Sequence, residues 1–444
     1  MHAPAVGADV QDRRRSIALA AALAAACVAI LVGSASPALA APNSLHLKAT
    51  YRASAFIHWA DSTLTVSSSA AVTNTTNAGA SALTFNLVPL ETGDATVSSV
   101  TAGGAPARFS ASGQSLIVTL PARLKPGTKT NVTIKYKAHF NAARSGSHRS
   151  LFIQQNGIVA AYRWIPWLSR AQRFNAPNFG ETWVTAVSPR VTVTLNSDTP
   201  LRYATNGTRT VNDGNRQIFV ARDVRDFNFA AGTDYEVTST THGGVAVTIF
   251  SATQPVSTIK KWTLAALDRF DSRIGNYPYP RLTVAETPGG SGMESPGMTW
   301  ISSTEPKSNL AYLAVHEVAH QWFYGAVGNN QALQPFLDEG VADFLARDML
   351  DQFRKSRCDK DRLDGSVYHY SAKCYNEVIY VQSSLYLNKY RQQVGDGKFW
   401  AGMSDFYRDY KFDLSGTRAF WDTLDNATGY ASHKHADRFP SLYP

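Results

Sequence analysis

The spacing of apolar residues along the chain changes once, near Pro255. Before that point, short runs alternate apolar and polar residues, and clusters of Gly, Pro, Asn and Asp separate them. The runs cover 62–72, 82–88, 115–120, 131–140, 190–195, 216–220 and 245–250. A period of two residues is that of a strand with one buried face, so the pattern predicts an antiparallel β domain over 43–250.

After Pro255 the period becomes helical. Apolar residues recur three or four positions apart over 256–274, and the sequence Asn-Tyr-Pro-Tyr-Pro at 276–280 ends that helix. A short strand is expected over 282–285. Further helices are expected to begin near Leu310, Pro335, Tyr375, Lys398 and Thr417. We therefore expect a mostly helical second domain over 251–444, with the boundary between Gly243 and Pro255, and an α+β multidomain class for the whole chain.

The composition is that of a globular protein. The chain has 444 residues, of which 44% are apolar and 17% charged, enough for two or three domains and too apolar for wholesale disorder. Its formal net charge is +9, but it holds no block of five basic residues, so we expect no nucleic-acid partner. Only nine of its 34 acidic residues are Glu, which makes Glu at a chemically meaningful spacing conspicuous.

The first forty residues have the pattern of a secretory signal peptide. Three arginines at 13–15 precede an uncharged, Ala-rich segment over 16–33, and Ala38-Leu39-Ala40 offers small residues for cleavage after Ala40. The sequence thus predicts a secreted or extracytoplasmic protein with no stable membrane association after cleavage. The alternative is an uncleaved membrane anchor, since 18 apolar residues can just span a bilayer.

Two cysteines, Cys358 and Cys374, remain once the signal peptide is removed. In an oxidising compartment a disulfide between them is the expected state. It would close a loop of about fifteen residues, worth about 3 kcal/mol by chain entropy. Two free, buried thiols are the alternative.

The strongest chemical signal is a zinc site. His316 and His320 are four residues apart in an apolar segment, so one helical face presents both imidazoles. Glu339, at the start of the next helical segment, can be the third ligand of one catalytic Zn²⁺ per chain and leave a fourth position for water. Glu317, beside the first ligand, can reach that water and is the expected general base.

Two assignments around this site have structural alternatives. Glu339 could be a helix-start carboxylate stabilised by the helix dipole. Asp343, four residues after Glu339, could hydrogen-bond a ligand histidine. An acid at that place in a helix is equally often a solvated side chain, and the sequence leaves both interpretations of Asp343 open.

The spacing of these residues resembles the aminopeptidase N family of gluzincin zinc metallopeptidases. His316-Glu-Val-Ala-His320, eighteen further residues and then Glu339 match the family's zinc motif, and Gly292-Met293-Glu294-Ser295 is similar to its GxMEN motif. The resemblance implies that Gly292, Met293 and Glu294 bind the substrate, with the Glu294 carboxylate on its α-amine. Ser295 stands where the family has Asn.

The resemblance also implies a catalytic tyrosine. The family frame of a tyrosine followed by Arg-x-x-x-Gly-Asp-x-x-Phe fits Arg391, Gly395, Asp396 and Phe399, and counting back gives Tyr380 rather than Tyr375 or Tyr386. For the amine site, the family's second binding residue has no clear counterpart, and Gln154 and Gln155 are the candidates.

By the same resemblance we expect a β-saddle domain, then a thermolysin-like zinc peptidase domain, and no C-terminal helical domain before the chain ends. The implied function is an exported zinc aminopeptidase that acts on peptides through metal-activated water. Two alternatives stay open. One is a zinc endopeptidase or other zinc hydrolase on the same core, and the other is a noncatalytic binding protein.

Overall fold

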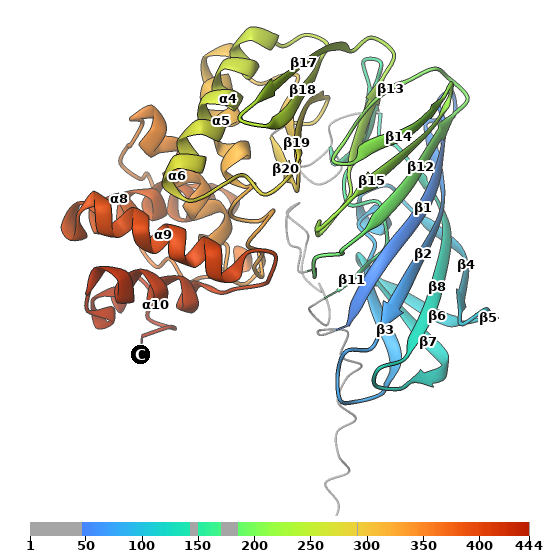
Figure 1. Ribbon diagram of the computed structural model, residues 1–444, viewed down its shortest axis with the longest axis horizontal. Helices are drawn as coiled ribbons and strands as arrows, with labels where there is room; N and C mark the ends of the chain where they lie inside the picture. The colour runs from blue at the N-terminus through green and yellow to red at the C-terminus, as the bar shows by residue number, and fades with distance from the viewer. Residues whose placement is uncertain (1–46, 143–149, 170–184, 291, 444) are drawn as a thin grey trace, which may run out of the picture. The chain divides into compact units, whose positions relative to one another are not determined.

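The computed structural model describes residues 47–142, 150–169, 185–290 and 292–443 (Figure 1). The expected signal peptide, 1–40, lies outside the described residues. Ser44–Pro444 form one compact unit. Each of the seven runs predicted as strands overlaps a strand of the structure, and each helix expected after Pro255 is present.

The largest sheet has eight strands in the order β14-β15-β12-β1-β2-β8-β4-β5. Neighbouring strands are antiparallel except β1 and β12, which pair in parallel. The alternation seen in the sequence becomes alternating burial, as in β8, where every second residue from Val132 to Ala138 is buried. The strands are β1 Lys48–His58, β2 Thr63–Thr73, β4 Thr96–Ala102, β5 Ala105–Pro106, β8 Lys129–His139, β12 Val191–Ser197, β14 Thr208–Asp213 and β15 Arg216–Ala221.

Two four-stranded sheets complete the first half of the chain. Their strand orders are β13-β16-β10-β9 and β11-β3-β7-β6, and all their pairings are antiparallel. Among the described residues, the helix between these strands is the single turn α2, Pro89–Thr92. The strands are β3 Ala80–Asn86, β6 Arg108–Ser112, β7 Ser115–Leu124, β9 Phe152–Gln155, β10 Ile158–Ala161, β11 Trp167–Leu168, β13 Arg202–Thr205 and β16 Phe229–Gly232.

A fourth sheet, of five strands, carries the motif around Glu294. Its order is β17-β18-β19-β21-β20, and β18, β19 and β21 run parallel to one another. Because β17 and β18 belong to this sheet, it begins before the boundary expected between Gly243 and Pro255. The strands are β17 Glu236–His242, β18 Val245–Ser251, β19 Arg281–Thr287, β20 Met293–Ser295 and β21 Met298–Ser302.

Helix α4 lies between β18 and β19 in the chain, and the later helices follow β21. Helix α4 contacts β18, and α5 contacts β20, β21 and α4, so the first zinc-motif helix is packed between the sheet and another helix (Figure 1). Two segments are π-helical, η3 Phe336–Gly340 and η5 Asn376–Gln382. The α-helices are α4 Val256–Arg273, α5 Leu310–Ala319, α6 Val341–Leu350, α7 Ala372–Tyr375, α8 Ser383–Val394, α9 Asp396–Tyr410 and α10 Thr417–Thr428.

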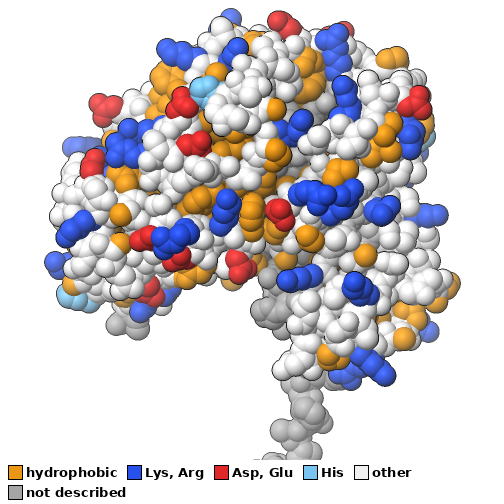
Figure 2. All heavy atoms as spheres, viewed as in Figure 1, with side chains coloured by type: hydrophobic (Ala, Val, Ile, Leu, Met, Phe, Trp, Pro, Cys, Tyr) orange, Lys and Arg blue, Asp and Glu red, His pale blue; other side chains and the backbone are white. Residues whose placement is uncertain are grey.

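The surface in view carries both signs of charge. Figure 2 shows Lys and Arg side chains scattered over this face, with Asp and Glu side chains among them. Within the described ranges, no helix combines the length and the apolar character that crossing a bilayer requires.

Candidate metal centre and active site

The two motif histidines lie at the end of a buried helix. His316 is in the last turn of α5, and His320 caps its C-terminus with a helical backbone conformation, which keeps the four-residue spacing on one face. Glu339 reaches the same point from η3. All three side chains are buried.

Their three ligand atoms form a nearly regular triangle. His316 Nε2 lies 3.2 Å from His320 Nε2 and 3.2 Å from Glu339 Oε2, and His320 Nε2 lies 3.4 Å from the same oxygen. Zinc at its usual 2.0–2.1 Å from N and O ligands would set tetrahedral edges of about 3.3–3.4 Å. The donor set and its spacing therefore fit one tetrahedral zinc ion with a position left for a fourth ligand.

The π-helical turn η3 presents Glu339. π-Helical turns are rare and concentrate at functional sites. The next residue, Gly340, lies so close to Ser383 at the start of α8 that a Cβ there would come within 2.7 Å of the serine Cβ. This close packing fixes the third ligand against the helices that follow it.

Asp338, which the sequence analysis missed, supports a ligand histidine. Its Oδ1 lies 2.8 Å from His320 Nδ1, the ring nitrogen that faces away from the triangle. The Phe323 carbonyl oxygen lies 3.1 Å from the same nitrogen and is its hydrogen-bond acceptor, so the two oxygens together select the ring tautomer and orientation that metal binding needs. The only sequence signal for Asp338 is its position next to Glu339.

The expectation that Asp343 hydrogen-bonds a ligand histidine is wrong. Asp343 is fully buried and accepts hydrogen bonds from the Tyr312 hydroxyl and from Arg347 Nε, the latter at 2.6 Å. Tyr312 in turn stacks on His316, with ring centroids 5.6 Å apart. Asp343 is therefore neither solvated nor bonded to a ligand, and Tyr312 connects it to the site.

Glu317 has the surroundings of a general base. It is buried, and its Oε2 has no hydrogen-bond partner among the described residues. Burial raises the pKa of its carboxyl well above the usual value. Gly292 lies against it, because a Cβ on that glycine would come within 2.1 Å of Glu317 Oε1. The glycine of the GxMEN-like segment thus makes room for the Glu317 carboxylate.

Glu294 lies on β20, close to the metal ligands. One of its carboxylate oxygens is within 4.8 Å of ligand atoms of both Glu317 and His320. Its Oε1 accepts hydrogen bonds from Tyr162 Oη at 3.1 Å, Arg163 Nη2 at 3.3 Å and Gln331 Nε2 at 3.2 Å. Burial raises the pKa of Glu294 to about 7. Met293, its neighbour on the strand, is buried in the core.

Ser295, the residue that follows Glu294, hydrogen-bonds a buried carboxylate. Ser295 Oγ donates to Asp226 Oδ1 at 2.6 Å, and Asp226 also accepts from the Tyr324 hydroxyl. Arg163 Nε lies 3.7 Å from Asp226 Oδ2. Ser295 thereby ties β20 to a buried charge cluster.

The glutamines proposed for the amine site are not at Glu294. The side chain of Gln154 donates to the Trp59 backbone carbonyl at 2.9 Å, and its own amide oxygen has no partner among the described residues. The structure brings Arg163 and Gln331 to the Glu294 carboxylate instead. The sequence analysis assigned a role to neither of them; they come from a loop after β10 and from the segment before η3.

Tyr380 lies on η5, the second π-helical segment. Its ring stacks on His316 with centroids 5.7 Å apart and an interplanar angle of 20°. The alternative Tyr386 has its hydroxyl hydrogen-bonded to His435 Nδ1 at 2.6 Å. Of these two, the structure places Tyr380 beside a metal ligand.

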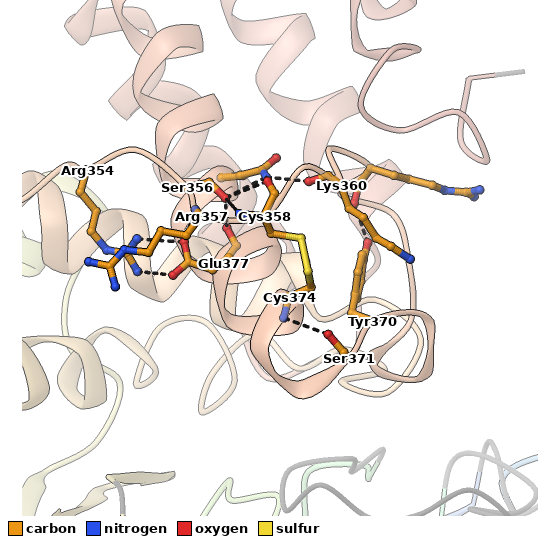
Figure 3. Close-up of a disulfide and its surroundings, with 11 residues drawn as sticks. Arg354, Ser356, Arg357, Cys358, Lys360, Tyr370, Ser371, Cys374 and Glu377 are labelled. Atoms are coloured by element: carbon orange, nitrogen blue, oxygen red, sulfur yellow. Dashed lines mark hydrogen bonds and ion pairs between the residues drawn. A yellow bond between two sulfur atoms is a disulfide. The ribbon is translucent and has the colours of Figure 1, made fainter.

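A disulfide joins Cys358 and Cys374, whose Cα atoms are 5.6 Å apart (Figure 3). Cys374 is in α7, which runs directly into η5 and Tyr380. Beside it, Arg354 makes two 2.9 Å hydrogen bonds to Glu377 and lowers the pKa of that carboxyl to about 2. These two links attach the segment before α7 to the helix that carries Tyr380.

The sequence is similar to those of several curated aminopeptidases. No family model matches the chain. Aminopeptidase 2 of Candida albicans is 21% identical over 375 residues, which are 72% of this chain and 39% of that protein. The puromycin-sensitive aminopeptidase of Caenorhabditis elegans is 21% identical over 71% of this chain and 38% of its own length. Aminopeptidase M1-C of Oryza sativa subsp. japonica is 21% identical over 36% of this chain.

The chain spans less than two thirds of the length of these curated relatives, from 22% for the rice protein to 39% for the Candida protein. Solved structures match more fully. A mutant of the M1 zinc metallopeptidase of Deinococcus radiodurans superposes with a TM-score of 0.67 at 18% identity, covering 86% of this chain and 92% of that one. A two-domain M1 zinc metallopeptidase bound to L-arginine gives the same TM-score. The chain therefore has the fold of the M1 zinc metallopeptidases, and its sequence is similar to those of curated aminopeptidases.

Proposed function

We propose that the protein is a zinc aminopeptidase. The observation that carries the proposal is the triangle of His316, His320 and Glu339 ligand atoms, with the Glu317 and Glu294 carboxylates beside it. The relatives in sequence are aminopeptidases, and one matching solved structure, from Deinococcus radiodurans, holds a Tyr-Ser-Ala substrate.

Each site residue has a distinct task in peptide hydrolysis. Zinc, when bound, supplies Lewis acidity and lowers the pKa of a water ligand to about 7. Glu317 accepts the proton of the attacking water and passes it to the leaving amine. Tyr380 donates a hydrogen bond to the oxygen of the tetrahedral intermediate, where negative charge develops. Asp338 holds the His320 ring in place through Nδ1.

Glu294 sets the end-specificity. A free α-amine has a pKa of about 8 and is largely cationic at neutral pH. The Glu294 carboxylate, held near the zinc ligands, fixes that amine so that only the first peptide bond reaches the metal. An endopeptidase would have no use for this contact.

The test compares a free-amine peptide with its N-acetylated form. Glu294→Ala is expected to cost about 2–4 kcal/mol in kcat/KM for the free-amine substrate and to leave the slow N-acetylated reaction unchanged. Glu91→Ala, at an exposed glutamate, is the matched control. Equal wild-type rates on both substrates, with no effect of Glu294→Ala on either, would establish the endopeptidase alternative.

We further propose that the protein is exported. The proposal rests on the pattern of residues 1–40, and the Cys358–Cys374 disulfide is consistent with an oxidising compartment. Mass spectrometry of the protein from culture medium or cell envelope is expected to give a mature N-terminus at Ala41. Intact Met1 on protein found only in the cytoplasm would contradict export.

A further inference from the structure

We propose that Arg163 and Gln331 are positioning residues for Glu294, which hold its carboxylate by one oxygen so that the other faces the substrate amine. This inference rests on the proposed aminopeptidase function. It assigns a role to two side chains that no zinc or GxMEN motif contains.

Both residues are buried, and both bond the same oxygen. Arg163 is 1% exposed and Gln331 is 3% exposed. Arg163 Nη2 and Gln331 Nε2 donate to Glu294 Oε1, and the Tyr162 hydroxyl is a third donor to that atom. Among the described residues, no side chain or backbone group donates to Glu294 Oε2. The carboxylate is thus fixed in rotation and leaves Oε2 for a cation.

Gln331 also connects this carboxylate to the metal site. Its Nε2 donates to Asp338 Oδ2 at 2.6 Å, and its Oε1 accepts from Arg163 Nη2 at 3.2 Å. Asp338 in turn lies 2.8 Å from His320 Nδ1. A single amide therefore sets the position of Glu294 relative to a zinc ligand, and this distance decides which peptide bond is cleaved.

Further contacts hold Arg163 in place. Its backbone N–H donates to Asn228 Oδ1 at 2.5 Å, and its guanidinium lies between the Tyr162 and Tyr324 rings, 4.6 and 5.1 Å from their centroids. Asp226 provides a second carboxylate 3.7 Å from Nε. The guanidinium therefore contacts both the Glu294 and the Asp226 carboxylates, which holds it beside β20.

The test uses two hydroxamates that differ only in the amine. Leucine hydroxamate and 4-methylpentanohydroxamate both bind zinc through their oxygens, but only the first has an α-amine. The ratio of their Kd values, measured by calorimetry on the zinc-loaded enzyme, reports the amine contact independently of turnover. We expect wild type to prefer leucine hydroxamate by about ten-fold or more.

Arg163→Met and Gln331→Leu should each reduce this preference at least about five-fold and change the affinity for the desamino probe by less than about two-fold. Arg163→Lys keeps the charge and should restore part of the preference. Gln154→Leu, whose amide bonds Trp59, is the control and should keep the wild-type ratio. Zinc content and melting temperature identify variants that fold.

Three outcomes would overturn the inference. The first is an unchanged ratio in folded Arg163→Met and Gln331→Leu. The second is a parallel loss of affinity for both probes, which would show a general structural role. The third is a failure of wild type to prefer the amine probe, which would refute the proposed aminopeptidase function itself and is distinguishable because it requires no variant.

Discussion

The metal triangle and the Glu294 cluster lie within a few ångströms of each other, yet they are built differently. The triangle comes from three residues on α5 and η3, close together in the chain, and helical geometry brings them together. The residues around Glu294 come from the loop after β10, the loop before β16, β20 and the segment before η3. The comparison teaches that the metal site depends on local spacing, whereas the amine site depends on the packing of distant segments.

Removal of the metal should have the largest effect, because every step at the triangle requires it. Dialysis against a chelator is expected to abolish peptidase activity, and one equivalent of zinc per chain should restore it. Elemental analysis should follow the activity in proportion. Full activity in protein shown to hold no transition metal would remove the metal from the mechanism.

Glu317→Gln should have the second largest effect, since it removes the base and keeps the size of the side chain. Turnover is expected to fall by about a hundred-fold or more while zinc content stays at one per chain. Tyr380→Phe should also lower kcat more than it changes KM, because its hydroxyl acts on the oxyanion. A normal kcat in either variant would give that residue a structural role only.

Asp338→Asn tests the link between the metal site and the Glu294 cluster, and we expect a moderate effect. An amide opposite His320 Nδ1 and Gln331 Nε2 cannot accept from both as a carboxylate does, so zinc affinity should fall about 10- to 100-fold. Asp343→Asn is the matched control, since Asp343 bonds Tyr312 and Arg347 and no ligand. Zinc titration with a competing chelator measures both. A larger loss in Asp343→Asn would reverse the assignment.

Loss of the disulfide should have the smallest effect. Reduction, or the Cys358→Ser/Cys374→Ser double variant, removes a constraint worth about 3 kcal/mol and should lower the thermal midpoint by roughly a few degrees. Zinc content should not change, because neither cysteine is a ligand. Mature protein whose two cysteines are both alkylated without reductant would contradict the bridge.

Local patterns were sufficient for the helices after Pro255 and for some of the strands. Strands such as β8 and the helix α4 follow the expected period within a few residues. Strand β1 was missed because its buried positions include three alanines and a tyrosine, whereas Phe56 is exposed. In β17 the sequence Glu-Val-Thr-Ser-Thr-Thr-His has no buried side chain, so no apolar period marks it as part of the last sheet.

The site residues likewise include some that the sequence predicts and some that it does not. His316, Glu317 and His320 follow from helical spacing because they share α5, and Glu339 follows from its fixed distance along the chain. Arg163 and Gln331 could not be predicted, because their roles depend on which segments pack around β20. Asp343 was misplaced for a similar reason. The Tyr312 hydroxyl from α5 and Arg347, one turn further along α6, both donate hydrogen bonds to its carboxylate.

The two π-helical segments make the site sensitive to chain length as well as to side-chain chemistry. A π-turn amounts to one residue inserted into an α-helix. Glu339 and Tyr380 both lie on such turns. Deleting one residue from either segment would remove the wide turn and change which of its side chains faces the zinc site. We therefore expect natural variation in these two segments to occur by substitution, while single-residue deletions are eliminated.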